Sequence, residues 1–207
     1  MTQVNKEHYK FEKYLDLARF SSYWYQLNEV LKRKPESVLE IGPGDYVFAN
    51  YLKQNTDIKY TSVDFAEDLK PDIVADLRKL PLPDNSHTIV CAFEVLEHLP
   101  FDEFENNLKE LLRVAKNSVI ISMPHWGRSF AFSFQIPLIG KYKINFKLPY
   151  KYFNIPHKWD GEHYFEIGKE NYPIEKIREK IWSAGGKLLN DFVPTENTYH
   201  HFFIIEK

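Results

Sequence analysis

The 207-residue sequence predicts an α/β protein whose core is a doubly wound, mostly parallel sheet of seven strands that ends in an antiparallel C-terminal strand hairpin. Three observations lead to this fold class. An apolar run enters a glycine turn at residues 38–44, strand-like and helix-like segments then alternate, and the last two strand-like segments have no helical pattern between them. Alternating elements favour parallel strands with helices on both faces, whereas a short link joins antiparallel neighbours.

Five apolar runs form the parallel part of the predicted sheet. We expect strands at residues 38–41, 59–63, 73–75, 88–93 and 118–123, with helices around 47–52 and over 102–115. The second helix is the clearer one, because Phe104, Leu108 and Leu111 make one apolar face. Asp102 and Glu105 have the spacing of a capping box at its start.

The two ends of the chain differ in character. Residues 8–33 carry apolar positions at helical spacing, so residues 1–35 are predicted to form a helical leader or cap, which can break into two helices before Pro35. Near the other end, Pro173 begins a helix that stops at Gly185-Gly186, and strands follow at 188–193 and 201–205. The predicted core therefore comprises residues 36–123 and 169–207, with an insertion at 124–168.

Composition and charge favour some classes of protein over others. A net charge of −2 gives no long-range attraction for nucleic acid or anionic lipid, although Lys141, Lys143 and Lys147 form a local basic strip. A membrane-surface role is disfavoured because the lysines form no dense cluster. Cys91 is the single cysteine and lies in an apolar run, as in a reducing compartment. Without an apolar signal core or a spanning stretch, we expect a cytoplasmic protein with no stable membrane insertion and no nucleic-acid partner.

Candidate ligand-binding residues lie where the first two strands end. Glu40 precedes the turn Gly42-Pro43-Gly44, and Asp64 follows twenty residues later at the end of the second strand. Glycines let the backbone approach a ligand, and a carboxylate after the second strand accepts hydrogen bonds from ribose hydroxyls. This is the outline of a nucleoside-binding βαβ unit. In the alternative interpretation, backbone amides satisfy Glu40, and Asp64 is a turn residue before Phe65.

Four ordered motifs resemble those of the class I S-adenosylmethionine-dependent methyltransferases, especially the broad type 11 group of small-molecule enzymes. The motifs are Leu39-Glu40-Ile41-Gly42-Pro43-Gly44, the acidic Asp64, Asp76-Leu77 with residues 80–86, and Phe93-Glu94-Val95-Leu96-Glu97-His98-Leu99-Pro100. The resemblance covers residues 36–123 well and the terminal helix and hairpin more loosely. It implies a Rossmann-like fold, S-adenosylmethionine as cofactor and S-adenosylhomocysteine as product.

The resemblance also implies roles for individual residues. Glu40 would anchor the amino-acid end of the cofactor, Asp64 its ribose, and Asp76-Leu77 would line the adenine ring, unless Asp76 belongs to a solvated loop. Tyr46 replaces a frequent third glycine and would cover the methionine moiety or narrow access to it. The implied cofactor-binding residues are Glu40, Gly42, Pro43, Gly44, Tyr46, Asp64, Phe65, Asp76, Leu77 and Phe93.

The insertion is rich in aromatic residues. Residues 124–168 hold 12 of the 33 aromatic residues, and Phe130, Phe132 and Phe134 alternate with small or polar residues as in a β-flap. A stretch of this length between regular elements is usually functional. We expect a lid over an aromatic or apolar methyl acceptor, built from Trp126, Phe130, Tyr152, Phe153 and Trp159. The alternatives are a lid that only completes the core and a homodimer contact.

Candidate catalytic residues follow the fourth strand. Glu94, Glu97 and His98 are spaced i, i+3 and i+4, so one helical turn would place them on one face, directed into the crevice at the carboxyl ends of the strands. We expect His98, His163 and Glu94 to carry catalysis by contacting the acceptor or removing its proton. The alternative is a polar loop in which His98 only hydrogen-bonds the backbone.

These residues also suggest a metal hypothesis. Glu94, Glu97 and His98, with the distant His163, resemble the pattern of two metal-assisted groups, the small-RNA 2′-O-methyltransferases and the ubiquinone-pathway O-methyltransferases. Two carboxylates and two imidazoles could hold a divalent cation that lowers the pKa of an acceptor hydroxyl. Many relatives share Glu-His here without a metal, so the sequence defines no firm metal site.

The sequence as a whole predicts an S-adenosylmethionine-dependent methyltransferase that acts on a small molecule, with an oxygen acceptor favoured over nitrogen or carbon. One alternative is a nicotinamide-dependent oxidoreductase, but the Gly-Pro-Gly turn and the terminal hairpin argue against it. The other is a protein that binds S-adenosylmethionine or S-adenosylhomocysteine without turnover.

Overall fold

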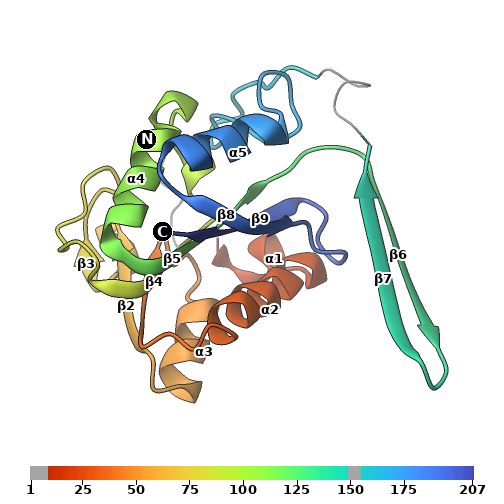
Figure 1. Cartoon of the computed structure of the whole chain (residues 1–207), viewed down its shortest axis with the longest axis horizontal. Coiled ribbons are helices and arrows are strands. Elements are labelled where there is room, and N and C mark those ends of the chain that lie inside the picture. Colours follow the sequence, from red (N-terminus) through yellow and green to blue (C-terminus); the bar gives the residue numbers. More distant parts are fainter. Residues whose placement is uncertain (1–8, 149–154) are drawn as a thin grey trace.

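The computed structural model describes residues 9–148 and 155–207, which form the predicted α/β architecture (Figure 1). One seven-stranded sheet has the order β3-β2-β1-β4-β5-β9-β8. Its strands are β1 (Ser37–Ile41), β2 (Lys59–Asp64), β3 (Ile73–Val74), β4 (His87–Phe93), β5 (Ala115–Pro124), β8 (Lys187–Phe192) and β9 (His200–Glu206). Strands β1 to β5 pair in parallel, while β9 lies antiparallel between β5 and β8. The predicted fold class and terminal hairpin are thus confirmed.

Helices cover both faces of the sheet. Helices α2 (Leu17–Leu31) and α3 (Val47–Asn55) lie on one face, and α4 (Phe104–Val114) and α5 (Ile174–Ser183) lie on the other (Figure 1). Successive strand residues point to opposite faces. Val38 therefore packs with Phe48 of α3 in one buried cluster, whereas its neighbour Leu39 packs with Leu108 of α4 in the other. This arrangement leaves the carboxyl ends of the parallel strands for a site.

From residue 9 onward, where the structure describes it, the leader contains the helices α1 (Phe11–Tyr14) and α2. The chain is extended between them, and the side chain of Asp16 then caps α2 by accepting a hydrogen bond from the Arg19 backbone N–H at 2.7 Å. No helix in the described parts of the chain is long and apolar enough to cross a membrane.

The start of α4 differs from the sequence prediction. Residues Phe101–Glu103 form a 3-10 turn, and the α-helix begins at Phe104 without a side-chain cap. Glu105 pairs with Lys109 at 2.7 Å instead of reaching back to Asp102, so the predicted capping box is wrong.

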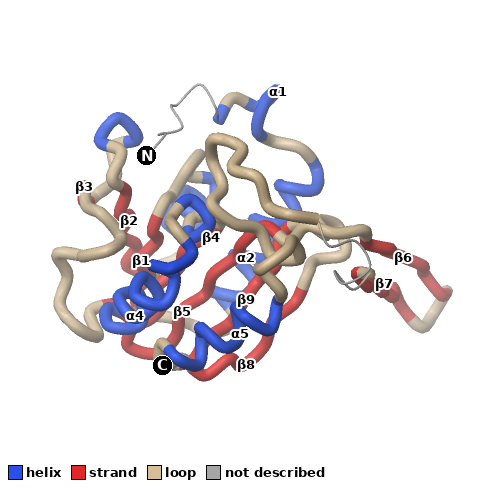
Figure 2. The backbone as a smooth tube through the Cα atoms, turned by 90° about the horizontal axis from the view of Figure 1, so that it is seen from above, coloured by secondary structure: helices blue, strands red, loops and turns tan. Residues whose placement is uncertain are grey.

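The insertion divides into two parts. Strands β6 (Ser129–Ile136) and β7 (Gly140–Lys147) form a separate two-stranded sheet that projects from the body of the protein (Figures 1 and 2). This sheet corresponds to the β-flap expected from the sequence. The end of the insertion behaves differently, because Phe165 and Ile167 are fully buried in the cluster beneath α4 and α5. The hydrophobic core therefore resumes before residue 169.

Candidate functional site

Two cavities lie at the carboxyl ends of β1, β2 and β4, where the strand order reverses between β1 and β4. Open α/β sheets bind their ligands at such a switch point. The larger cavity has a volume of about 140 Å³ and is lined by Gly42, Asp64 and His98, among others. The smaller one has about 30 Å³ and is lined by Glu40 and Gly44.

The glycine turn after β1 has a backbone that side chains rarely adopt. Gly42 has φ +67° and Gly44 has φ +56°, both in the left-handed region. A Cβ on Gly42 would lie 2.7 Å from Val95 Cγ2, and one on Gly44 would lie 3.3 Å from the ring of Tyr9. Gly42 therefore requires glycine for the backbone and for space, whereas Gly44 requires it mainly for the backbone.

The acidic residue after β2 has two roles at once. Asp64 lines the larger cavity together with Phe65, and its Oδ1 accepts a hydrogen bond from the Ala66 backbone N–H at 2.9 Å. Burial raises the pKa of Asp64, although backbone hydrogen bonds from Ala66 and Phe65 oppose this shift. Asp64 thus shapes the turn, as in the alternative interpretation, and also faces the cavity.

Asp76 and Leu77 also line the larger cavity. The Asp76 carboxylate is already engaged by Arg78, whose Nε lies 3.0 Å from Oδ1, and hydrogen bonds from Arg78 lower the pKa of Asp76. Leu77 is buried beside it. The loop is therefore partly solvated and partly a wall of the cavity.

Glu40 lies in the wall of the smaller cavity with Pro43 and Phe93. Its Oε2 accepts a short hydrogen bond from the Tyr60 hydroxyl. Burial raises the pKa of Glu40 to about 8, and the hydrogen bond from Tyr60 opposes the shift. Glu40 is therefore mostly protonated at neutral pH when no cation is near it.

Tyr46 lies in the wall of neither cavity. It begins α3 with φ 63°, and its hydroxyl donates to the backbone oxygen of Leu69 at 3.0 Å. This placement gives no support to the expectation that its side chain covers the methionine moiety.

Glu94 contributes to both cavities. It has φ 55°, a left-handed conformation that costs a non-glycine residue about 1–3 kcal/mol. Its Oε1 accepts a hydrogen bond from Ser122 Oγ at 2.7 Å, and its Oε2 lies 3.6 Å from His200 Nε2. The helical turn predicted to hold Glu94 with Glu97 spans only Leu96–His98, so Glu94 does not share its face.

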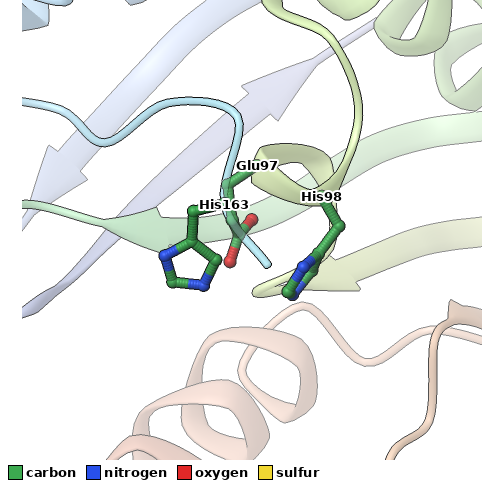
Figure 3. Close-up of side chains that lie close together, drawn as sticks. All are labelled: Glu97, His98 and His163. Carbon is green, nitrogen blue, oxygen red and sulfur yellow. The ribbon is translucent and has the colours of Figure 1, made fainter. Parts of the chain in front are cut away.

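His98 and His163 meet edge to face, with ring centroids 5.0 Å apart (Figure 3). His98 Nδ1 lies 3.0 Å from the Glu162 carbonyl oxygen. Because a carbonyl can only accept, Nδ1 carries the hydrogen and Nε2 is left to accept a proton. Burial, together with the charge of His163, lowers the pKa of His98. Burial acts in the same direction on His163, but the hydrogen bond to Glu166 and the charges of Asp160 and Glu166 together outweigh it and raise the pKa of His163.

Glu97 lies beside the two histidines (Figure 3). It is fully buried, and neither carboxylate oxygen has a hydrogen-bond partner among the described residues. Burial raises the pKa of Glu97, and the negative charge of Glu94 raises it further. Glu97, His98 and His163 each offer a ligand atom, all within 4.8 Å of one another. Three of the four residues in the metal hypothesis therefore come together in the described chain, without Glu94.

The sequence interpretation missed several residues around these cavities. Asp160 and Glu166 form a second group with His163, and their i, i+3, i+6 spacing was the available signal. Tyr9 lines the larger cavity, and Tyr14 and Arg19 line the smaller one, with the Arg19 guanidinium 4.1 Å from the centre of the Tyr14 ring. No motif in the leader indicates this position.

The aromatic residues expected in the lid are dispersed. Trp159 lines the larger cavity, and its ring lies 4.5 Å from that of Tyr164. Trp126 and Phe130 line neither of the two cavities, because Phe130 belongs to the projecting hairpin. Tyr152 and Phe153 lie outside the described residues.

Comparison with known families finds a methyltransferase domain in the middle of the chain. Residues 39–123 match a family model described as a methyltransferase domain. This match spans the glycine turn, Asp64 and the stretch after β4, and the sheet topology accords with it. The match to residues 39–123 agrees with the predicted resemblance to the class I S-adenosylmethionine-dependent methyltransferases, whose cofactor is S-adenosylmethionine. The nicotinamide alternative receives no support. No curated protein sequence matches the chain.

Solved structures share the fold at low sequence identity. A SAM-dependent methyltransferase from Aquifex aeolicus is 18% identical, with a TM-score of 0.61 and 99% of each chain covered. The 1,6-didemethyltoxoflavin-N1-methyltransferase of Burkholderia thailandensis, solved with S-adenosylhomocysteine, is 12% identical with a TM-score of 0.60, covering 92% of this chain and 78% of its own. The [4+2]-cyclase SpnF is 13% identical with a TM-score of 0.60, covering 92% and 80%.

The residues present fit this cofactor. The two left-handed glycines leave room where a Cβ would clash, Asp64 faces the larger cavity, and Glu40 lies in the smaller one. A nucleoside with a charged tail has a polar group within reach at each end of this arrangement.

Proposed function

We propose that the chain methylates a hydroxyl oxygen of a small molecule and that His98 acts as the general base. The observation that carries this proposal is the position of His98 in the wall of the same cavity as Gly42 and Asp64, with Nε2 free to accept a proton. A base at hydrogen-bonding distance from the acceptor is what an oxygen nucleophile requires.

The chemistry divides between cofactor and protein. When bound, the cofactor supplies a methyl group that its sulfonium already activates. The protein aligns the acceptor and excludes water, and His98 Nε2 takes the hydroxyl proton as the new carbon–oxygen bond forms. The lowered pKa of His98 keeps it neutral at pH 7, as a base must be. Glu94 lies in the wall of both cavities, where its carboxylate can orient the acceptor.

The aromatic residues in the wall of the larger cavity support an aromatic or apolar acceptor. Trp159 and Tyr164 pack against each other there and offer ring surfaces with few polar groups. The Burkholderia thailandensis protein acts, by its name, on a nitrogen of a small heteroaromatic molecule. A nitrogen acceptor is therefore the alternative within the same enzyme class, and it does not need the base.

An acceptor panel tests the proposal. Phenols, aliphatic alcohols and heteroaromatic amines are incubated with the protein and S-adenosylmethionine, and S-adenosylhomocysteine is measured. We expect turnover of a hydroxyl compound that falls at least about 100-fold in His98→Gln, with unchanged affinity for S-adenosylhomocysteine. His87→Gln is the matched control, since His87 lies at the start of β4 and lines neither cavity. Turnover of amines alone, or full activity in His98→Gln, would refute the oxygen assignment.

A metal-assisted variant of this function has one specific observation in its favour. The Glu97 carboxylate is buried without partners beside His98 and His163, and such a group is costly unless a cation or proton satisfies it. A divalent cation there would lower the pKa of an acceptor hydroxyl. Calorimetric titration with Mg²⁺, Mn²⁺ and Zn²⁺ tests this variant, with Glu97→Gln as the comparison. Absence of heat with all three metals would remove it.

A protein that binds the cofactor without methyl transfer is the remaining candidate. The similarity to a [4+2]-cyclase supports keeping it, because one fold can host different reactions. Tight binding of S-adenosylmethionine with no product from any acceptor would favour it over the enzyme.

A further inference from the structure

The β6–β7 hairpin has one apolar face, and this face is uncovered. Three cross-strand pairs place six apolar side chains on one side of the ribbon: Phe130 with Phe146, Phe132 with Ile144, and Phe134 with Tyr142. Each keeps 42–54% of its surface exposed, and neither buried cluster includes a residue of the hairpin. A contiguous apolar patch of this kind marks an interaction surface.

The opposite face is polar and is attached to the body of the protein. Lys143 pairs with Glu196, and Ser129 Oγ donates to Thr198 Oγ1 at 2.7 Å. Asn145 Nδ2 donates to the Val193 backbone oxygen at 2.9 Å. These contacts hold the hairpin against the link between β8 and β9, so its apolar face is turned outward.

The turn of the hairpin is apolar as well. It consists of Pro137, Leu138 and Ile139, with Leu138 fully exposed and Ile139 67% exposed. Hairpin turns usually carry Asn, Asp or Gly. Here the part of the hairpin that projects farthest from the sheet carries aliphatic side chains instead (Figures 1 and 2).

The charged residues within the hairpin segment itself are all basic. Residues 111–159 contain no Asp or Glu, whereas residues 124–159 contain six Lys or Arg, although the whole chain has a net charge of −2. Lys141 is exposed and directly follows the turn residue Gly140. From the sequence, a membrane-surface role was disfavoured because the lysines form no dense cluster. In the folded chain the continuous feature is the apolar face. Lys141 is exposed near the turn, whereas Lys143 lies on the opposite face and pairs with Glu196.

We propose that the β6–β7 hairpin docks the protein on the surface of an anionic lipid bilayer, with its apolar face and turn in the interfacial layer. Buried apolar area provides the attraction, and the acid-free segment is drawn to anionic headgroups. Among residues 9–148 and 155–207 the two strands have no further strand partner at their outer edges, so the hairpin lies in the interface and does not span the hydrocarbon. A second copy on the same face would oppose two acid-free segments of like charge.

Vesicle flotation with the full chain tests this proposal. Vesicles of phosphatidylcholine alone, or with about one third phosphatidylglycerol, are floated through a sucrose gradient at low and high salt. We expect the protein to float with the anionic vesicles, less with the neutral ones, and less at high salt. Leu138→Ser/Ile139→Ser and Phe132→Ser/Phe134→Ser should each lower partitioning at least about tenfold.

Controls separate the hairpin from general hydrophobicity. Trp182→Ser removes an aromatic side chain of α5 that is 80% exposed, and it should float like the unaltered protein. Binding of S-adenosylhomocysteine, measured on every variant, reports that the fold is retained, and the docking proposal does not depend on the methyl acceptor. No flotation with either vesicle, or equal flotation of the turn variant, would overturn it. So would a dimer, seen by sedimentation velocity, that Phe132→Ser/Phe134→Ser dissociates while vesicles bind nothing.

Discussion

Replacing Gly42 with alanine tests the glycine turn by two separable effects. At φ +67° an alanine backbone costs about 1–2 kcal/mol relative to glycine. The new Cβ would also lie 2.7 Å from Val95 Cγ2, a distance that side chains do not tolerate. Val95 lines the larger cavity and would have to move into it or carry its backbone along. The strain therefore acts on folding, and the displacement of Val95 acts on ligand binding.

We expect Gly42→Ala to lower the free energy of unfolding by about 2 kcal/mol, with the affinity for S-adenosylhomocysteine falling at least about tenfold. Urea denaturation measures the first quantity and titration calorimetry the second. Gly44→Ala is the matched comparison, because its φ of +56° brings similar strain but its Cβ meets the Tyr9 ring at a milder 3.3 Å.

A double variant separates the two effects. Gly42→Ala/Val95→Ala removes the methyl group that the new Cβ would strike, so affinity should recover toward that of Val95→Ala while the loss of stability remains. Unchanged affinity in Gly42→Ala, or no recovery in the double variant, would show that the turn does not contact the cofactor as inferred.

Further predictions concern single ionisable residues. Asp64→Ala should weaken cofactor binding at least about tenfold, as measured by calorimetry. Asp64→Asn keeps an acceptor for the Ala66 N–H, so comparing the two variants should distinguish loss of the ribose contact from loss of the turn. Burial raises the pKa of Glu40 to about 8, so Glu40 should lose its proton when a ligand ammonium enters the smaller cavity. Because the buffer takes up this proton, the binding enthalpy at pH 7 should depend on the buffer, and Glu40→Gln should abolish this dependence. Since the pKa of His98 is lowered, methyl transfer should rise with pH below 6.5 and reach a plateau at neutral pH; a rise centred above pH 7 would exclude His98 as the base. Burial opposes ionisation of Glu166, but three side-chain hydrogen bonds hold its pKa at about 2. The ionised carboxylate therefore stabilises the fold above pH 4.5, and this stabilisation is lost as the pH falls toward 2. In urea titrations, Glu166→Gln should lower the free energy of unfolding at pH 7 by up to about 3 kcal/mol and flatten its dependence on acid pH.

The sheet and the glycine turn were predictable because both depend on local pattern. Buried parallel strands appear as short apolar runs, and a backbone with positive φ next to a ligand selects glycine, as at Gly42. The terminal antiparallel strands followed from the missing helix between them. Each of these signals lies within a few residues of the element that it predicts.

Other features depend on contacts between distant segments and left little local trace. Glu94 adopts a left-handed conformation although it is not glycine, and Ser122 from the neighbouring strand holds its carboxylate there. Phe165 fills the core beneath α4 although its neighbours in sequence belong to an irregular loop. The spacing in the sequence predicted Glu94, Glu97 and His98 on one helical face, but the helical turn begins only at Leu96, so Glu94 lies outside it.

The leader has a consequence for the pace of the reaction. Tyr9 belongs to the wall of one cavity, and Tyr14 and Arg19 belong to the wall of the other, yet these residues come from a short segment outside the sheet. Because these residues are part of both cavity walls, we expect release of the spent cofactor to require this segment to detach. An affinity tag fused ahead of Tyr9 would then slow or speed every catalytic cycle without altering any residue that touches the transferred methyl group.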